Sequence, residues 1–185
     1  PSRSKLGAAL SRARKTQYDL MPQEGDTCLY LGAGHGTSLS HIHDQVCGAN
    51  NQKNGRIIAV DLSPRCVRDL VHLSTLRPGL VPVLGDARKH SVWGVMVARK
   101  VDWLLQDVSQ AGQAEIFINA VRRFLKPGGK GLLSLKAASE RFSDGGEREV
   151  FKNVRLQLED AGLTIEEQID LHGLEDNHCL YFITN

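Results

Sequence analysis

Short apolar runs alternate with helical patterns along this 185-residue chain, and that alternation indicates a fold of the α/β class. The first run covers residues 27–31 and contains no charged residue, which is typical of a strand buried on both faces. A glycine-rich turn follows at Gly32–Gly36, and residues 37–46 then carry a helical pattern. We therefore predict a strand–turn–helix unit at this point, as in a parallel sheet.

The same order recurs through the rest of the chain. Further strands are predicted at residues 56–60, 81–84, 101–106 and 131–136. Helices are predicted from Ser63-Pro64, over 111–125 and over 148–161, with Pro127-Gly128-Gly129 stopping the second of them. The last two strands, 164–171 and 179–184, have no helix between them and should form an antiparallel hairpin. These elements predict a Rossmann-like seven-stranded sheet, mostly parallel with an antiparallel terminal hairpin, with helices on both faces.

The whole chain, residues 1–185, is predicted to be one domain, in which residues 1–24 form a helical segment leading into the sheet. Its content of 41% hydrophobic and 24% charged residues is ordinary for a globular protein. No apolar run is long enough to span a bilayer, so no membrane partner is expected. Four cysteines without a CxxC pair predict reduced thiols rather than a metal site: Cys28, Cys47, Cys66 and Cys179.

The charge of the chain is small and unevenly distributed. A net charge of +2 is weak for a protein that grips nucleic acid unaided. The first fifteen residues are nevertheless basic and contain no acid; their cations are Arg3, Lys5, Arg12, Arg14 and Lys15. Two interpretations remain open, a solvated helix face and an edge that meets phosphates.

The carboxyl ends of the predicted strands carry residues suited to a cofactor, because ligands of open parallel sheets bind at that edge. The turn Gly32–Gly36 lets the backbone approach a ligand closely. Asp61 can accept hydrogen bonds from two ribose hydroxyls, and Asp86 can accept one from an adenine amino group. A single aspartate of this kind could be an ordinary helix cap or turn residue. With Asp107 there are three at successive strand ends, which favours a cofactor that contains a nucleoside.

Dinucleotides and S-adenosylmethionine both fit this arrangement. The turn Gly-x-Gly-x-Gly lacks the spacing of the dinucleotide fingerprint. The interval from Gly32 to Asp61 is also longer than the roughly 20 residues expected of a dinucleotide site, with the loop 48–55 absorbing the excess. The terminal hairpin is typical of the class I methyltransferase sheet. We therefore favour S-adenosylmethionine, and a dehydrogenase is the weaker alternative.

Several segments, taken in order, resemble the fibrillarin family of RNA 2′-O-methyltransferases and together cover nearly the whole chain. Arg3-Ser4-Lys5-Leu6 resembles its RSKL segment, residues 29–41 resemble LYLGAASGTTVSH, and Asp86-Ala87-Arg88 matches DAR. Asp107-Val108-Ser109-Gln110 resembles DVAQ, Leu135-Lys136-Ala137 resembles IKA, and Asn177-His178 falls where the family has Asp-His.

The resemblance implies ribose 2′-O-methylation of RNA, with ribosomal RNA as the expected substrate, by an enzyme that uses S-adenosylmethionine and no metal. It implies a catalytic tetrad of Lys5, Asp107, Lys136 and His178. Cofactor contacts carry over to Gly32, Ala33, Gly34, Gly36, Thr37, Asp61, Leu62, Asp86, Ala87, Asp107 and Gln110. As partners it implies a guide RNA and the scaffold protein of a box C/D-type or other ribonucleoprotein.

Within this tetrad, Lys136 is expected to contact the ribose hydroxyl, either as the base or as an orienting cation. Asp107 is expected to hold the Lys136 ammonium in place. His178 is expected to orient the nucleotide or to relay the proton.

The chain also departs from the family pattern. Gly34-His35 replaces Ala-Ser, Asp61 replaces a glutamate, Asn177 replaces an aspartate, and the module that precedes RSKL in the family is absent from this sequence. Two alternatives therefore stay open, a catalytically silent structural or assembly factor of a ribonucleoprotein and a methyltransferase of protein glutamine side chains. The compartment is open as well: nucleus or nucleolus for a eukaryotic nuclear protein, cytoplasm for an archaeal one, and an organelle if an address signal precedes Pro1.

Overall fold

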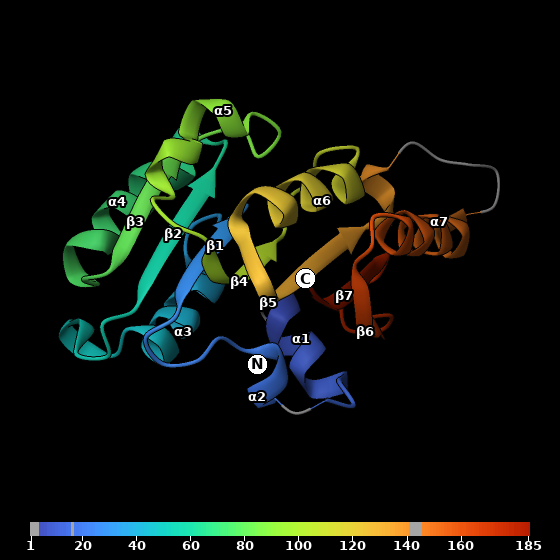
Figure 1. The fold of residues 1–185 in the computed structure, drawn as a ribbon, viewed down its shortest axis with the longest axis horizontal. Coiled ribbons are helices and arrows are strands. Elements are labelled where there is room, and N and C mark those ends of the chain that lie inside the picture. Colours follow the sequence, from blue (N-terminus) through green and yellow to red (C-terminus); the bar gives the residue numbers. More distant parts are fainter. Residues whose placement is uncertain (1–3, 16, 141–145) are drawn as a thin grey trace.

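A computed structural model describes residues 4–15, 17–140 and 146–185 of the chain, so the predicted role of Arg3 lies outside the described residues. Its strands form one seven-stranded sheet in the order β3-β2-β1-β4-β5-β7-β6 (Figure 1). The strands are β1 Thr27–Leu31, β2 Arg56–Asp61, β3 Leu80–Leu84, β4 Val101–Gln106, β5 Leu125–Lys136, β6 Thr164–Asp170 and β7 His178–Thr184. The neighbours among β1 to β5 pair in parallel, and β7 pairs antiparallel with both β5 and β6. The predicted mostly parallel sheet with an antiparallel terminal hairpin is confirmed.

Helices cover both faces of the sheet, as predicted. One face carries α1 Lys5–Arg12, α2 Gln17–Leu20, α3 Thr37–Val46 and α4 Pro64–Leu76. The other carries α5 His90–Trp93, α6 Gln113–Phe124 and α7 Gly146–Asp160. Short 3-10 turns occur at Ala49–Asn51, Gly94–Met96 and Ala137–Ser139. Within the described residues, no helix combines the length and apolar character needed to cross a membrane.

Each central strand contributes alternate residues to two separate cores, because successive side chains of a strand point to opposite faces. In β1, Leu29 and Leu31 pack toward α6 and α7, whereas Cys28 and Tyr30 pack toward α1 to α4. All five residues of β1 are buried. This burial on both faces explains why the strand lacks the polar alternation of a half-exposed sheet.

The start of β5 differs from the prediction. The helix was expected to run to residue 125 and the strand to begin at 131, but α6 ends at Phe124 and β5 begins at Leu125. Leu125 has extended backbone angles and pairs with Val101, and the register then shifts before Trp103 pairs with Lys130. The Pro127-Gly128-Gly129 segment therefore lies in an irregular part of a strand rather than at a helix end.

Candidate cofactor and active site

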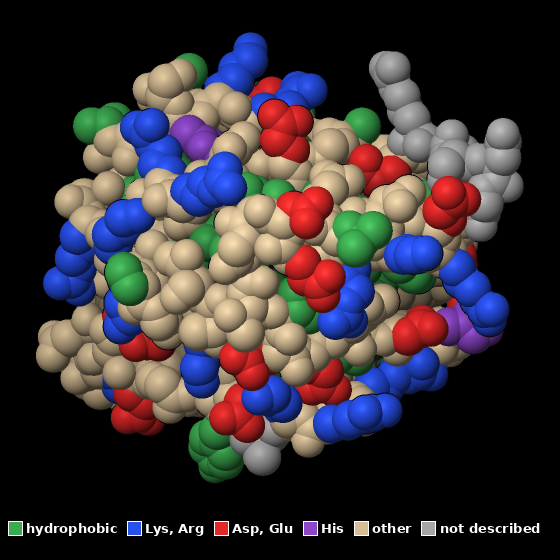
Figure 2. All heavy atoms as spheres, turned by 45° about the vertical axis from the view of Figure 1, so that its right-hand side comes forward, with side chains coloured by type: hydrophobic (Ala, Val, Ile, Leu, Met, Phe, Trp, Pro, Cys, Tyr) green, Lys and Arg blue, Asp and Glu red, His purple; other side chains and the backbone are tan. Residues whose placement is uncertain are grey.

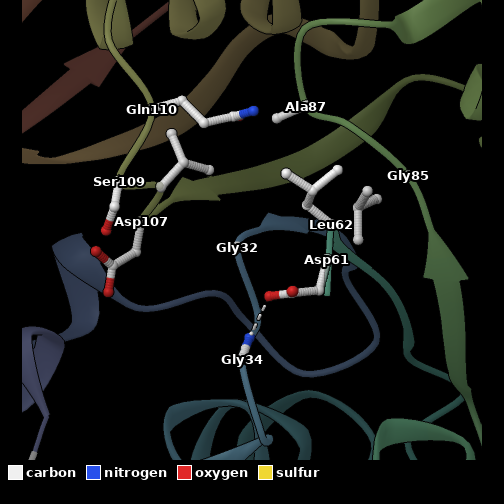
Figure 3. Close-up of a pocket in the computed structure, with 11 residues that line it drawn as sticks. Gly32, Gly34, Asp61, Leu62, Gly85, Ala87, Asp107, Ser109 and Gln110 are labelled. Carbon is white, nitrogen blue, oxygen red and sulfur yellow. Dashed lines mark hydrogen bonds between the residues drawn. The ribbon is translucent and has the colours of Figure 1, made fainter. Parts of the chain in front are cut away.

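A cavity of about 450 Å³ opens at the carboxyl ends of the central strands (Figure 3). From β1 the chain adds β2 and β3 on one side of that strand. It then crosses to the other side of β1 to form β4, so the strand order reverses between β1 and β4. Such a switch point leaves a crevice outside the sheet because the two loops diverge to opposite faces. The cavity is lined by Gly32, Gly34, Val60, Asp61, Leu62, Gly85, Ala87, Asp107, Val108, Ser109 and Gln110.

Seven of the predicted cofactor residues lie in this cavity: Gly32, Gly34, Asp61, Leu62, Ala87, Asp107 and Gln110. The other four do not line it. Ala33 is buried in the core, Gly36 is the N-cap of α3, Thr37 lines a separate hollow between α1 and α3, and Asp86 accepts a hydrogen bond from the cavity residue Gln110. The cavity is also lined by four residues that were not predicted, although each adjoins or lies close to a predicted one: Val60, Gly85, Val108 and Ser109. Their positions at or next to the ends of predicted strands would have been sufficient to include them among the candidate cavity residues.

Gly32 brings the end of β1 against the end of β4. It has a positive φ of 81°, and a Cβ at this position would lie 2.2 Å from the backbone oxygen of Asp107. Only glycine can therefore occupy the turn without moving β4. The backbone at Gly34 faces open space instead, since no atom lies within 4 Å of a Cβ built there.

Asp61 is held in place by the backbone at the mouth of the cavity. The N–H of Gly34 donates to Asp61 Oδ2 at 2.8 Å, and the N–H of Ser63 donates to Oδ1 at 2.8 Å. A carboxylate has about four acceptor positions, so each oxygen keeps one for a ligand. The arrangement can accept the two neighbouring hydroxyls of a ribose.

Asp86 is engaged within the protein. Its carboxylate accepts hydrogen bonds from the Arg88 guanidinium, the shortest at 2.7 Å, and from Gln110 Nε2 at 3.0 Å. The Arg88 guanidinium holds the pKa of Asp86 well below its usual range, despite the opposing effect of burial. With its amide nitrogen held by Asp86, Gln110 presents its side chain to the cavity, where Figure 3 shows it beside Ala87.

Lys5 and Asp107 form an ion pair at the same end of the sheet. Lys5 Nζ lies 2.7 Å from Asp107 Oδ1, and the two side chains are 25% and 22% exposed. Lys5 is the first residue of α1, whose N-cap Ser4 accepts a hydrogen bond from the N–H of Gly7. The predicted partner of Asp107 was Lys136, and this expectation is not met: α1 places the Lys5 ammonium directly on the carboxylate.

Lys136 and His178 are opposite each other in the antiparallel β5–β7 pair, so their side chains share one face of the sheet. That face is the α1 face, because Leu132 of β5 and Leu180 of β7, each an even number of residues away, pack in the same core as Leu6 of α1. All four residues of the predicted tetrad thus lie on the α1 face. Among the described residues, no hydrogen bond or ion pair links Lys5 and Asp107 to Lys136 and His178.

The tautomer of neutral His178 follows from its hydrogen bond. Its Nδ1 lies 2.8 Å from the backbone oxygen of Asp176, and a carbonyl oxygen can only accept, so Nδ1 carries the proton. Nε2 is then left with a lone pair, and within the described structure this atom is buried and has no partner. Buried polar atoms normally have a hydrogen-bond partner, so one without a partner is explained by a ligand, a water or a catalytic role.

The backbone of Lys136 is fixed by Gln113, a fully buried residue that sequence analysis did not single out. Gln113 Oε1 accepts from the N–H of Lys136 at 3.0 Å, and Gln113 Nε2 donates to the Lys136 carbonyl oxygen at 3.0 Å. Glu140 in turn accepts from the backbone N–H of Gln113 at 2.8 Å and so caps the start of α6. The end of β5 is therefore rigidly positioned, while the Lys136 ammonium makes no ion pair in the described part of the chain.

Comparisons with known proteins agree on one family. A model of the Fibrillarin family matches residues 1–185. The chain is 39% identical over 183 residues to the fibrillarin-like rRNA/tRNA 2′-O-methyltransferase of Thermococcus gammatolerans, covering 99% of this chain and 76% of that protein.

Solved structures of the same family are also similar. Aeropyrum pernix fibrillarin, solved with natively bound S-adenosyl-L-methionine, has a TM-score of 0.83 and 35% identity, with 99% of this chain and 75% of that one covered. A fibrillarin/Nop5p complex has a TM-score of 0.87 and 32% identity, with coverage of 100% and 82%.

Proposed function

The chain belongs to the fibrillarin family, and we propose that its cavity binds S-adenosylmethionine while Lys5, Asp107, Lys136 and His178 position and deprotonate a ribose 2′-hydroxyl of RNA. It is an RNA 2′-O-methyltransferase that depends on S-adenosylmethionine. The observation that carries the proposed roles is the position of the Lys5–Asp107 pair, because Asp107 lines the cofactor cavity and also lies on the face that holds Lys136 and His178.

The cavity residues suit the parts of this cofactor. Asp61 keeps free acceptor positions for the ribose hydroxyls, and the glycines at 32 and 34 leave backbone exposed to the amino-acid portion. Gln110 donates to Asp86 through Nε2, which leaves its Oε1 to accept from the adenine amino group. When bound, S-adenosylmethionine supplies a methyl group on a positively charged sulfur.

Methyl transfer needs the hydroxyl to approach in line with the bond that breaks and to lose its proton. We assign the proton to His178 Nε2, which is an unprotonated acceptor in the neutral ring. Lys136 lies opposite it in the β5–β7 pair, and its ammonium, which has no ion-pair partner among the described residues, stabilises negative charge as it develops on the ribose oxygen. The Lys5–Asp107 pair links α1 to the cavity edge and orients the approach of the ribose.

The target RNA is presented by other molecules of a ribonucleoprotein. Figure 2 shows Lys and Arg side chains interspersed with Asp and Glu side chains, and the net charge is only +2. Part of the basic N-terminal segment also faces β6, where Lys15 Nζ lies 2.9 Å from Glu166 and Arg12 donates to the Asp170 backbone oxygen. A ribonucleoprotein scaffold protein is the partner, as the similar fibrillarin/Nop5p complex indicates, and we propose that a guide RNA selects the nucleotide.

The relatives reported above favour one of the compartments considered. Thermococcus gammatolerans and Aeropyrum pernix are archaea, so we propose the cytoplasm and find no support for a nucleus.

Calorimetric titration with S-adenosylmethionine tests the cavity. We expect the intact chain to bind and Asp61→Ala to bind at least about tenfold more weakly, since two charge-assisted hydrogen bonds to the ribose are lost. Asp160→Ala is the matched control, because Asp160 is exposed at the end of α7 and should leave binding unchanged. A well-folded chain that does not bind would contradict the proposal.

A methyl-transfer assay tests the acceptor. Labelled methyl groups should appear in ribose of a guided RNA target and not in a glutamine-containing protein. Transfer to the protein alone would favour the glutamine alternative.

A further inference from the structure

A second group of chemically active side chains lies next to the cofactor cavity, on the outer side of the glycine turn. Cys66 Sγ lies 3.6 Å from His35 Nε2, and His35 Nδ1 lies 2.7 Å from Asp69 Oδ2. His35 belongs to the turn between β1 and α3, whereas Cys66 and Asp69 lie in the first two turns of α4. His35 is also one of the positions at which this chain departs from the family pattern.

The hydrogen bonds assign a role to each member. The Asp69 carboxylate is anionic near neutral pH, since the hydrogen bond from His35, followed by that from Arg68, lowers the pKa of Asp69. The carboxylate accepts, so His35 Nδ1 carries a proton and Nε2 of the neutral ring presents its lone pair to the Cys66 thiol. A nucleophile within reach of a base that a third group orients is the arrangement that activates cysteines in enzymes.

Position and exposure also distinguish Cys66 from the other cysteines. Cys28, Cys47 and Cys179 are buried, whereas Cys66 is partly exposed and His35 is 56% exposed, so small molecules can reach the sulfur. Cys66 is the third residue of α4 and lies close to the N-terminus of that helix. The two nitrogens of His35 face different partners, and the described residues contain no group of three or more His, Cys, Asp or Glu arranged for a metal.

Two hydrogen bonds to Asp61 link this group to the cavity, one from the turn that carries His35 and one from the start of α4. Gly34, the neighbour of His35, donates its N–H to Asp61, and Asp61 also accepts from Ser63, the N-cap of the helix that carries Cys66. Oxidation adds an oxygen to a sulfur that lies only 3.6 Å from His35 Nε2, so the product needs more space beside this ring. A displacement of His35 that extends to its neighbour Gly34 would disturb the hydrogen bond by which the turn holds Asp61.

We propose that Cys66 is a modification site, a nucleophilic thiol activated by His35 and oriented through Asp69, and that its reaction with a peroxide weakens binding of S-adenosylmethionine. The thiol proton passes to His35 Nε2, and the thiolate attacks one oxygen of the peroxide. The O–O bond breaks as an S–O bond forms, which oxidises the thiol to a sulfenic acid. Hydrogen peroxide is reduced, and its other oxygen leaves with the proton from His35 as water.

The first experiment measures the reactivity of the thiol and does not depend on the proposed function. The protein is treated with hydrogen peroxide and dimedone at neutral pH, and labelling of Cys66 is followed by mass spectrometry. We expect His35→Ser, which introduces the residue that the family has here, to slow labelling at least about tenfold, because the base that accepts the thiol proton is lost. Asp69→Asn should slow it as well. Equal rates in the unchanged protein and His35→Ser would overturn the proposal.

The second experiment measures coupling to the cavity, and this part rests on the proposed function. After peroxide treatment, the dissociation constant for S-adenosylmethionine should rise at least about tenfold, a change of about 1.4 kcal/mol. Cys66→Ser should bind like the untreated protein before and after peroxide. An unchanged dissociation constant in protein whose Cys66 is fully oxidised would overturn the coupling. Absence of binding before any treatment would instead contradict the proposed function and leave the labelling rates to decide the reactivity of the thiol.

Discussion

Lys5 and Asp107 are separated by 102 residues in the chain, yet Lys5 Nζ lies 2.7 Å from Asp107 Oδ1. The contact joins the first helix to the end of the strand that borders the cofactor cavity. Partly exposed ion pairs contribute little to stability, so the pair is better explained by the proposed reaction site than by folding.

Asp107→Asn should therefore separate activity from stability. We expect single-turnover methyl transfer to fall at least about 100-fold, because a group that positions the reactants is lost. The free energy of unfolding in urea should fall by no more than about 1 kcal/mol. Lys126→Ala breaks an ion pair with Asp102, at the other end of the same strand, and should leave methyl transfer unchanged. A stability loss of about 4 kcal/mol in Asp107→Asn, as for a buried pair, would assign it a structural role instead.

His178→Phe should lower activity without unfolding the protein. The ring loses the proton acceptor Nε2, so methyl transfer should fall at least about 100-fold. The apolar ring loses the Nδ1 hydrogen bond to the Asp176 backbone oxygen but also removes Nε2, which is buried and has no partner in the described structure, so the unfolding free energy should change by less than about 1.5 kcal/mol. Rapid-quench transfer assays and urea melts measure the two effects. His72→Phe, on the exposed side of α4, is the control, and full activity of His178→Phe would remove this residue from the mechanism.

Two glycines of the same turn should respond differently to alanine. Gly32→Ala combines a positive φ with a Cβ 2.2 Å from the backbone of Asp107. We therefore expect the free energy of unfolding to fall by about 3 kcal/mol and cofactor binding to be lost. Gly34→Ala meets no neighbouring atom within 4 Å and should cost only about 1 kcal/mol of backbone strain. Denaturation midpoints of the two variants test this order. Equal costs would mean that strain rather than the contact with β4 requires glycine at position 32.

The Asp86 carboxylate should make stability depend on pH in the acid range. Its folded pKa lies below the ordinary value of 3.8, so its contribution is present above that pH and is lost progressively as the pH falls below it. The difference in unfolding free energy between the unchanged protein and Asp86→Asn should therefore be largest near about pH 6 and shrink toward about pH 2.5. Urea melts across this range measure the difference. A constant difference would show that the charge of Asp86 contributes nothing to folding.

Local sequence patterns were sufficient for the architecture. Burial of β1 on both faces, the Ser63-Pro64 start of α4 and the helical spacing of α6 each follow from neighbouring residues, and the seven predicted strands are all present. The prediction was wrong at the start of β5, where Leu125 leaves the helix to pair with Val101. That pairing depends on a strand 24 residues earlier, so local propensity could not reveal it.

The chemistry of the site was predicted only in part. Resemblance to a family named the tetrad, and the strand-end rule named Asp61 and Asp107, both of which line the cavity. Neither source indicated that Asp86 would be engaged by Arg88 and Gln110, or that Gln113 would hold the backbone of Lys136 on both sides.

The order of residues along the chain thus decides which segments become strands and which strand ends carry acids and glycines, since hydrophobic periodicity and turn chemistry act over a few residues. Tertiary structure decides which of those ends meet. The ion pair of Lys5 with Asp107, the opposition of Lys136 and His178, and the contact of Cys66 with His35 all depend on how strands pair and helices pack. The physical reason is that these groups lie tens of residues apart in the chain, and only strand pairing and helix packing bring them together.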